Sequence, residues 1–291
     1  MNHQKPFVQL LFLSLVTVLF SLASCQQEGS SNATKVQATS DQKATIPPKT
    51  DTDTMAKKPI PTPKIELDSS ITLDYIMGKF DPARHKDFSK IEPRHASRTG
   101  MYLRNDAYAA FKEMYLAAKE EGIKLAILSA TRNFASQKRI WEAKWNGNRL
   151  LDGGINAREA IPDPKARGLK ILEWSSMPGS SRHHWGTDID INALNNSYFT
   201  KGKGLEEYKW LQANAARFGF CQTYSPKGKE RPYGYNEEKW HWSFLPYAKR
   251  LSDQAQLRLK DEMIKGFDGS EVASEIGIVK KYVLGINTAC L

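Results

Sequence analysis

The chain has 291 residues, of which 40% are hydrophobic, so it is long enough to bury the core of one large domain or two small ones. Its formal net charge is +10, but the sequence lacks the basic helices and aromatic-interleaved basic patches that nucleic-acid readers carry. The composition argues against a nucleic-acid partner and favours a solvated basic surface.

The N-terminus has the features of an export signal. Lys5 precedes the apolar run 7–22, which is shorter than the ~20 residues of a membrane-spanning helix. The run ends in Leu-Ala-Ser-Cys at 22–25, which resembles a bacterial lipoprotein signal, in which the cysteine is lipidated and becomes the mature N-terminus. We expect residues 1–25 to be such a signal, with lipidated Cys25. Ordinary secretion is the alternative.

Residues 26–68 are rich in Ser, Thr, Gln, Lys and Pro and contain almost no aromatic residues. Such a composition cannot bury enough apolar area to offset chain entropy, so we expect a disordered tether with partly extended proline segments. The tether would provide reach from a membrane surface. The sequence thus predicts a cell-envelope protein, lipid-anchored to a bacterial membrane and facing the periplasm or the exterior.

Helical and strand-like segments alternate from residue 105 onward. Apolar residues recur at helical spacing over 105–122, with polar caps at the start and a glycine at the end. A buried strand is expected at 124–129, and the turn 131–133 leads into a second helix that carries Gln137, Ile140, Trp141 and Trp145. We interpret 146–180, which is rich in Gly, Pro and charge, as a long loop that could line a cleft.

The later elements mix short strands and helices. In order, they are a strand at 188–192, a helix at 204–218, a strand at 219–224, a hairpin-like segment at 225–233, and tail helices at 248–265 and 270–284. The mixture predicts an α+β fold with a small central antiparallel sheet and flanking helices. We expect a folded domain at 69–245, with a C-terminal helical extension at 246–291 packed on it.

Two cysteines remain once Cys25 is assigned to lipid. A disulfide between Cys221 and Cys290 can persist in an exported domain. Two buried free thiols fit nearly as well, because Cys221 lies in an apolar strand-like run and the sequence does not place the two residues together. Both alternatives stay open.

A small set of residues has the composition of a hydrolytic zinc site. Such sites commonly take three ligands from His, Asp and Glu and leave one position open for water. His183 and Asp190 flank a turn into a strand, on which Asp188 and Asp190 share one face. His241 is the remaining histidine in a dense polar and aromatic setting. Glu238, three residues before it, can serve as a base beside the metal.

Two motifs frame these residues, SRHHWGTDID at 181–190 and EKWH at 238–241. They resemble the S-x-H-x-x-G-x-A-x-D and E-x-W-H signatures of the zinc-dependent D-alanyl-D-alanine carboxypeptidases of VanY type. Residues 130–133 with Gln137 resemble the segment that carries the family's substrate arginine. The similarity spans about residues 100–245 and implies a fold of the hedgehog/D-Ala-D-Ala-peptidase kind.

The resemblance assigns roles within these motifs. It implies that His183, Asp190 and His241 bind one Zn²⁺ per chain and that Glu238 is the general base that deprotonates a zinc-activated water. Zinc lowers the pKa of such a water to ~7 and polarises the scissile carbonyl. These residues therefore include the three metal ligands and the general base that a zinc peptidase needs.

Further roles follow from the same resemblance. Arg132 would grip a terminal carboxylate or the developing oxyanion, and Ser181 and Gln137 would help to hold the substrate. Asp188 departs from the family, which usually has alanine there. It orients a ligand, adds negative charge near the metal or is an alternative ligand. We place His184, which points away from its neighbour, behind the ligands or in the cleft wall.

The expected function is hydrolysis of peptidoglycan stem peptides, with removal of the terminal D-alanine as the first choice. LD-carboxypeptidase or wall endopeptidase activity on the same scaffold is an alternative. A non-catalytic peptidoglycan-binding lipoprotein is another, although the intact Glu238 and ligand set count against it.

Overall fold

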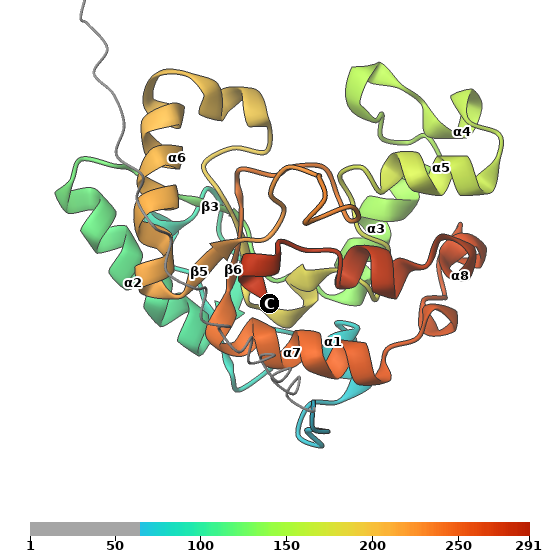
Figure 1. The fold of residues 1–291 in the computed structure, drawn as a ribbon, viewed down its shortest axis with the longest axis horizontal. Helices are drawn as coiled ribbons and strands as arrows, with labels where there is room; N and C mark the ends of the chain where they lie inside the picture. The colour runs from blue at the N-terminus through green and yellow to red at the C-terminus, as the bar shows by residue number, and fades with distance from the viewer. Residues whose placement is uncertain (1–64) are drawn as a thin grey trace, which may run out of the picture. The chain divides into compact units, whose positions relative to one another are not determined.

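The computed structural model describes residues 65–291 (Figure 1). The predicted lipoprotein signal with Cys25, and the predicted tether up to residue 64, lie outside the described residues. Within 65–291, no helix combines the length and apolarity needed to span a bilayer. Residues 66–68 belonged to the predicted tether, but they are held against a helix: the backbone N–H of Asp68 donates to Gln254 Oε1 (3.0 Å), and Gln254 Nε2 donates to Glu66 O (2.8 Å).

Two small antiparallel sheets form the centre of the described part. One pairs β1 (Phe88–Lys90) with β2 (Tyr102–Arg104). The other has the order β3-β4-β6-β5, made of β3 (Ile127–Ser129), β4 (Asp188–Ile191), β6 (His241–Phe244) and β5 (Phe220–Gln222). Every strand pair in these sheets is antiparallel. The predicted α+β fold with a small antiparallel sheet and flanking helices is therefore confirmed.

Eight α-helices surround the sheets in the described part. They are α1 (Leu73–Ile76), α2 (Asn105–Glu120), α3 (Phe134–Trp145), α4 (Ala157–Ala160), α5 (Pro164–Ile171), α6 (Gly202–Asn214), α7 (Leu245–Arg258) and α8 (Ala273–Ile276). The start of α3 is capped by Asn133, whose side chain accepts from the N–H of Ser136 (3.0 Å). Helix α2 lies within the predicted segment 105–122, and α3 contains the four residues predicted for the second helix.

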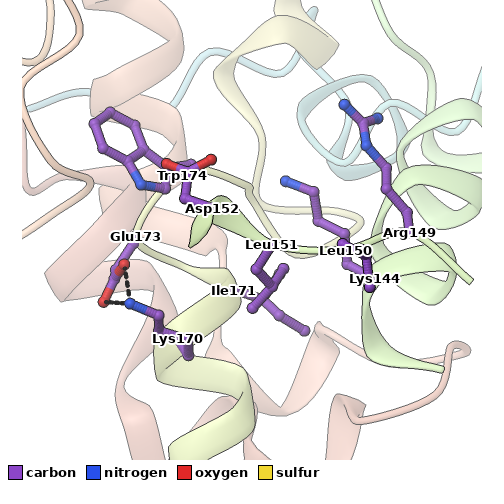
Figure 2. Close-up of a pocket in the computed structure, with 9 residues that line it drawn as sticks. All are labelled: Lys144, Arg149, Leu150, Leu151, Asp152, Lys170, Ile171, Glu173 and Trp174. Atoms are coloured by element: carbon purple, nitrogen blue, oxygen red, sulfur yellow. Dashed lines mark hydrogen bonds and ion pairs between the residues drawn. The ribbon is translucent and has the colours of Figure 1, made fainter. Parts of the chain in front are cut away.

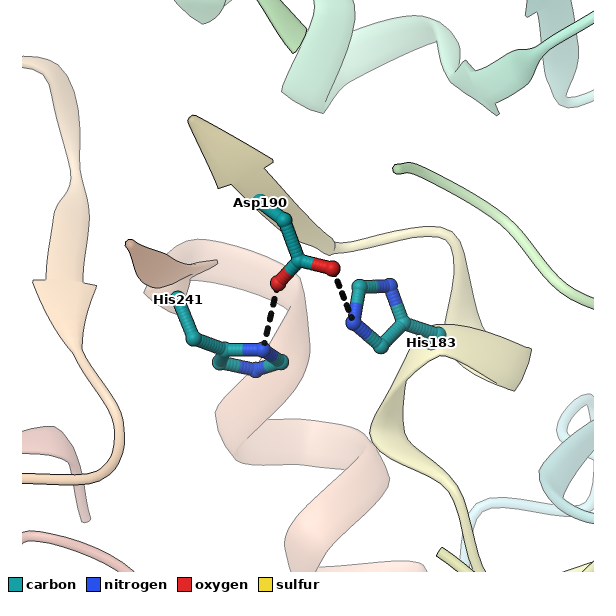
Figure 3. Close-up of side chains that lie close together, drawn as sticks. All are labelled: His183, Asp190 and His241. Atoms are coloured by element: carbon teal, nitrogen blue, oxygen red, sulfur yellow. Dashed lines mark hydrogen bonds and ion pairs between the residues drawn. The ribbon is translucent and has the colours of Figure 1, made fainter. Parts of the chain in front are cut away.

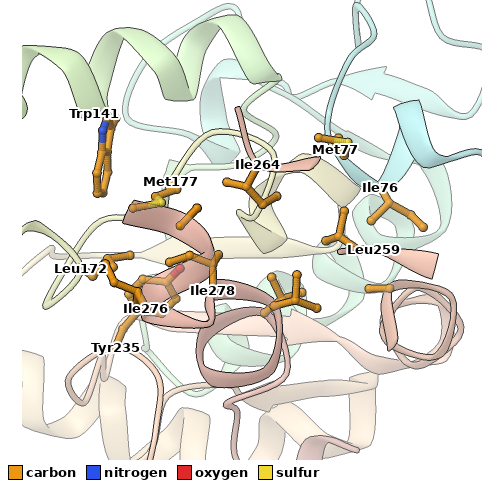
Figure 4. Packing of buried hydrophobic residues seen from close by; sticks show 14 of the residues in the cluster. Ile76, Met77, Trp141, Leu172, Met177, Tyr235, Leu259, Ile264, Ile276 and Ile278 are labelled. Atoms are coloured by element: carbon orange, nitrogen blue, oxygen red, sulfur yellow. The ribbon is translucent and has the colours of Figure 1, made fainter. Parts of the chain in front are cut away.

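Two clusters of buried hydrophobic side chains hold these elements together. In one, α2 and α6 pack against the isoleucines Ile189 and Ile191 of β4. In the other, side chains from α1, α3 and α5 meet side chains from α7 and α8, including Trp141 and Ile276 (Figure 4). Residues 246–291 therefore share a core with the N-terminal part of the described chain. Because both cores lie within 65–291, this part has what it needs to fold on its own.

Four predicted segments differ from the structure. The predicted tail helix 248–265 ends at Arg258, the last residue of α7. The predicted loop 146–180 contains α4 and α5, and α5 begins where Asp163 caps a helix with proline at its first position. The predicted tail helix 270–284 is broken because Gly277 adopts the left-handed conformation (φ 78°). The predicted hairpin-like segment at 225–233 forms no strands, but Gly228 and Arg231 exchange two backbone hydrogen bonds (3.1 and 3.2 Å) across a tight turn. The Arg231 side chain also donates to backbone carbonyls of the segment, including Tyr233 O (2.8 Å).

Cys221 and Cys290 form a disulfide. Their Cα atoms lie 5.8 Å apart, and the residues are separated by 69 positions in the sequence. The bond ties the C-terminal end of the chain to β5. Of the two alternatives left open by the sequence, the structure has the disulfide.

Candidate metal and substrate site

A cleft with a volume of about 700 Å³ opens beside the four-stranded sheet. It is lined by most of the predicted site residues, namely Arg132, Gln137, His183, Asp190, Glu238 and His241. A smaller recess of about 70 Å³ lies next to it, lined by residues of α3, of α5, of the segment between them and of the turn after α5 (Figure 2). The two spaces share four residues, which are Lys144, Arg149, Asp152 and Trp174.

Three side chains meet on the sheet side of the cleft. His183 lies in the turn Arg182–Trp185, Asp190 in β4 and His241 in β6. One potential ligand atom from each lies within 4.8 Å of the others. The carboxylate of Asp190 stands between the two rings, with Oδ2 3.4 Å from His183 Nε2 and Oδ1 3.0 Å from His241 Nδ1 (Figure 3). All three residues are at most 5% exposed.

Gly186 makes the turn between His183 and β4 possible. Its backbone is left-handed (φ 73°), and a Cβ at this position would lie 2.3 Å from the ring of Phe88. Only glycine meets both requirements without a shift of the surroundings. The strand that follows pairs Asp190 with His241 across β4 and β6. The turn and the strand register together bring the three side chains to one point.

The donor set fits a zinc ion. Two imidazole nitrogens and one carboxylate are ligands that catalytic zinc takes. His183 Nδ1 lies 2.9 Å from the carbonyl oxygen of Ala130, which can only accept, so Nδ1 carries the proton and the free Nε2 faces Asp190. Burial lowers the pKa of His183, which keeps the ring neutral and able to bind a cation.

The charges at this point also suit a cation. Burial alone would raise the pKa of Asp190, but the two histidines outweigh it and hold that pKa well below its usual value. Burial alone would lower the pKa of His241, but the hydrogen bonds to Asp188 and Asp190 outweigh it and raise that pKa to about 9. The negative charge that Asp190 retains therefore favours a cation at this point, which a bound metal ion would supply.

Glu238 lies beside this group without being part of it. Its Oε2 is 3.6 Å from His241 Nδ1, and the residue lines the cleft. Burial raises the pKa of its carboxyl to about 8. A carboxylate next to the proposed ligands, yet outside the group of three, has the position that a general base requires.

Arg132 follows β3 and extends into the cleft. Its backbone N–H donates to His183 O (3.1 Å), so the arginine and the histidine are fixed relative to each other. Its Nε donates to Gln137 Oε1 (2.9 Å), and its Nη1 lies 3.6 Å from Asp190 Oδ2. The side chain is 22% exposed, which leaves part of the guanidinium open to the cleft.

Three other sequence-predicted positions have different surroundings. Gln137 accepts from Arg132 and donates to Ser176 O (2.8 Å), so it orients the guanidinium. Ser181 is 1% exposed and does not line the cleft, and its role in substrate binding stays a prediction. His184 also lies outside the cleft lining; its Nε2 accepts from the Gly179 N–H (2.9 Å), and its Nδ1 donates to Arg132 O (2.5 Å).

Three further cations of the cleft lining were not predicted from the sequence. Lys144 and Arg149 line both the cleft and the smaller recess, and Arg98 lines the cleft. Lys144 follows Gln137 by seven positions on α3, so helical spacing places both on one face. That spacing is a signal that could have identified Lys144. Arg98 and Arg149 lie outside helices and strands and offer no comparable pattern.

A buried His-Asp-His group with a carboxylate beside it, at one end of a small sheet, is the arrangement of a metal-dependent hydrolase. A family model described as "VanY: D-alanyl-D-alanine carboxypeptidase" matches residues 100–247. The chain belongs to this family. The matched region contains β3, β4, β5 and β6 and all of the predicted site residues in the cleft.

Curated relatives match the same part of the chain. The putative carboxypeptidase YodJ of Bacillus subtilis (strain 168) is 33% identical over 146 residues, which cover 50% of this chain and 46% of the relative. A D-alanyl-D-alanine carboxypeptidase of Enterococcus faecalis (strain ATCC 700802 / V583) is 28% identical over 141 residues, which cover 46% of this chain and 45% of the relative. The chain thus spans about half the length of these relatives.

Solved structures show a more distant likeness. VanYB in complex with D-alanine-D-alanine is 24% identical, with 58% of this chain and 84% of that chain covered and a TM-score of 0.42. The LdcB LD-carboxypeptidase is 25% identical, with 68% of this chain and 79% of that chain covered and a TM-score of 0.42.

Proposed function

We propose that the protein is a zinc-dependent peptidase that hydrolyses peptidoglycan stem peptides by removing the terminal D-alanine. The observation that carries this proposal is the presence, in one cleft, of three potential metal ligands, a separate buried carboxylate and an accessible guanidinium. Membership of the VanY family supports the same conclusion. His183, Asp190 and His241 are the proposed ligands, Glu238 the proposed base and Arg132 the proposed substrate anchor.

The proposed mechanism divides the chemistry between the ligands and Glu238. When bound, a zinc ion supplies a Lewis acid that polarises the scissile carbonyl and lowers the pKa of a water to ~7. Glu238 accepts a proton from the attacking water and delivers it to the leaving amine. Burial raises its pKa in the metal-free protein to about 8, and a neighbouring cation favours the ionised form that a base needs.

Arg132 favours exopeptidase over endopeptidase activity. A guanidinium binds a carboxylate through two parallel hydrogen bonds, and the free carboxylate of a stem peptide lies at its end. Gln137 fixes the Nε side of this guanidinium, while its Nη1 donates to Ser129 Oγ and lies 3.6 Å from Asp190 Oδ2, beside the proposed metal ligands. A C-terminal residue gripped there would present its peptide bond to Glu238.

The charge of the cleft supports an acidic peptide as substrate. Arg98, Lys144 and Arg149 line it in addition to Arg132, while Asp152 is the only carboxylate on the lining apart from Asp190 and Glu238 in the described residues. Stem peptides carry carboxylates in addition to the terminal one, and a positive wall concentrates such substrates near the site.

We also propose that Cys25 anchors the protein to a bacterial membrane by lipid and that residues 26–64 tether it, with the peptidase facing the periplasm or the exterior. The support is the sequence pattern at 1–25 and the composition of the segment that follows. This proposal is independent of the active site, because a peptidase released from the membrane would have the same cleft.

The test of the enzymatic proposal uses residues 65–291. We expect the purified protein to bind about one zinc ion, measured by elemental analysis after dialysis. We expect it to release D-alanine from a synthetic stem pentapeptide, detected by mass spectrometry. Intact pentapeptide after incubation with fully zinc-loaded protein would overturn the enzymatic proposal in favour of a non-catalytic binding protein.

A further inference from the structure

Asp188 lies directly behind the proposed metal ligand His241. The register of β4 and β6 pairs Asp190 with His241 and Asp188 with Ser243. The His241 ring therefore stands between two carboxylates of one strand. Its Nδ1 lies 3.0 Å from Asp190 Oδ1, and its Nε2 lies 2.9 Å from Asp188 Oδ2. Of the two carboxylates, Asp190 lines the cleft and Asp188, with no exposed surface, does not.

The carboxylate of Asp188 is fixed from the other sides. The hydroxyls of Thr187 and Ser243 both donate to its Oδ1 at 2.7 Å, and Arg182 Nε donates to its Oδ2 at 3.2 Å. These three donors leave the carboxylate no freedom to turn away from His241. The last acceptor position of Oδ2 is directed at the imidazole.

Arg182 connects this carboxylate to α7. The guanidinium is 1% exposed and stacks 4.4 Å from the ring of Trp185. Its Nη1 donates to Ser252 Oγ of α7 (3.0 Å), and its Nη2 donates to Ser243 Oγ (3.1 Å). A fully buried network therefore runs from α7 through Arg182 and Asp188 to His241. Such networks hold side chains in one orientation when every member is satisfied.

We propose that Asp188 is a positioning residue that holds His241 with its Nε2 protonated and its Nδ1 free to bind zinc. A carboxylate fixed by donors can only accept, so the nitrogen that faces it must carry the proton. The other nitrogen, Nδ1, faces Asp190, and when a metal ion lies between Asp190 and the ring, Nδ1 would offer its lone pair to that ion. Outer partners of this kind set the orientation and basicity of a metal-bound histidine. This inference rests on the proposed metal site.

The two proposed histidine ligands are held in different ways. His183 donates from Nδ1 to a neutral backbone carbonyl, Ala130 O. His241 donates from Nε2 to a buried carboxylate. The VanY-type motif usually has alanine at position 188, so this chain adds an acidic partner where the motif provides none. Asp188 is too far behind the ring to be an alternative ligand, since His241 separates it from Asp190.

A simpler explanation is that Asp188 serves only as the counter-ion of Arg182. The two explanations differ in what Asp188→Asn changes. The amide of asparagine has one accepting oxygen, whereas a carboxylate has two. In one orientation of this amide His241 loses its acceptor, and in the other the hydroxyls of Thr187 and Ser243 lose theirs. The counter-ion role predicts lower stability with unchanged zinc affinity. The positioning role predicts that zinc affinity also falls.

The experiment compares zinc affinity in three forms of residues 65–291 by competition with a chromophoric chelator. We expect Asp188→Asn to weaken zinc binding by about 10- to 100-fold. The matched control is Glu207→Gln, because Glu207 of α6 is another buried carboxylate with a hydroxyl partner, Tyr198 (2.9 Å), outside the cleft. Its zinc affinity should equal that of the wild type.

A second readout follows the ring of His241 directly. In ¹⁵N-histidine-labelled, zinc-loaded wild type, we expect a protonated Nε2 and a metal-bound Nδ1 for His241, with an altered Nε2 signal in Asp188→Asn. If Asp188→Asn does not fold, Arg182→Met/Asp188→Ala replaces it, because removing both partners leaves no buried charge unpaired. We expect the same loss of zinc affinity in that variant.

The outcomes separate this inference from the proposed function. A wild type that binds no zinc would overturn the proposed function. A wild type that binds zinc, together with an Asp188→Asn variant of equal affinity and unchanged ring signals, would overturn the positioning role alone. An equal loss of affinity in Glu207→Gln would also overturn it, because the effect would then come from any buried carboxylate.

Discussion

The two walls of the cleft differ in how firmly their polar groups are held. On the sheet side, His183, Asp190 and His241 are buried and hydrogen-bonded from behind. On the opposite side, Arg149 and Asp152 are exposed. Fixed, desolvated groups suit metal binding and catalysis, whereas exposed charges suit the recognition of a substrate. The contrast agrees with the proposed function, in which one wall would perform the reaction and the other would select the peptide.

The largest effects are expected on the sheet side. Glu238→Ala should reduce kcat by about 10²- to 10⁴-fold and keep zinc, because a general base is not a ligand. His241→Ala should lose both zinc and activity. Elemental analysis and D-alanine release measured on both variants check the assignment. Loss of zinc from Glu238→Ala would show that the roles of base and ligand are wrongly divided.

Arg132→Ala tests whether Arg132 binds the terminal carboxylate of the substrate. We expect kcat/KM for peptides with a free terminal carboxylate to fall by about 100-fold, since the variant loses charge-assisted hydrogen bonds. Amidated peptides should be affected much less. Arg139→Ala is the control, because Arg139 is also an arginine of this region but donates to Ser136 Oγ and does not line the cleft. Equal losses on both kinds of peptide would contradict a carboxylate grip.

The smallest effect is expected at Lys144, which tests the opposite wall. Burial, with the nearby charge of Arg149, lowers the pKa of Lys144 to about 8. The lysine therefore loses its positive charge as the pH rises through about 8, and KM for acidic peptides should rise a few-fold over this interval. Lys144→Arg stays charged, so its KM should rise less. KM is measured from pH 7 to 9.5 for the wild type and for Lys144→Arg. Equal changes of KM in the two proteins would rule out this role of Lys144.

Local sequence patterns predicted much of the fold. The alternation of Asp and Ile over 188–191 predicted which side chains of β4 share a face, and the isoleucines lie in the core. Helix α5 was missed, although Asp163 and Pro164 are a cap and a first-turn proline. The break at Gly277 was missed because the apolar spacing continues across it. The first error was a neglected local signal; in the second, helical periodicity outweighed a stop signal.

The site was predictable only where its residues lie within motifs that resemble those of a known family. The chain order of His183, Asp190, Glu238 and His241 resembled a known pattern, and the structure brings all four to one cleft. The partner of Asp188 was not predictable. Asp188 and His241 are 53 residues apart in the sequence, and they meet only through the register between β4 and β6. Long-range pairing of this kind has no local signal.

The most direct measurement is a digest of muropeptides with zinc-loaded residues 65–291, with Glu238→Ala as a parallel control and the products separated by mass. The account predicts that pentapeptide muropeptides lose one D-alanine and become tetrapeptides in the wild type alone. Loss of the next residue instead would indicate LD-carboxypeptidase activity, and an internal cut would indicate an endopeptidase. Either product in place of tetrapeptides, or the same products with Glu238→Ala, would contradict the account.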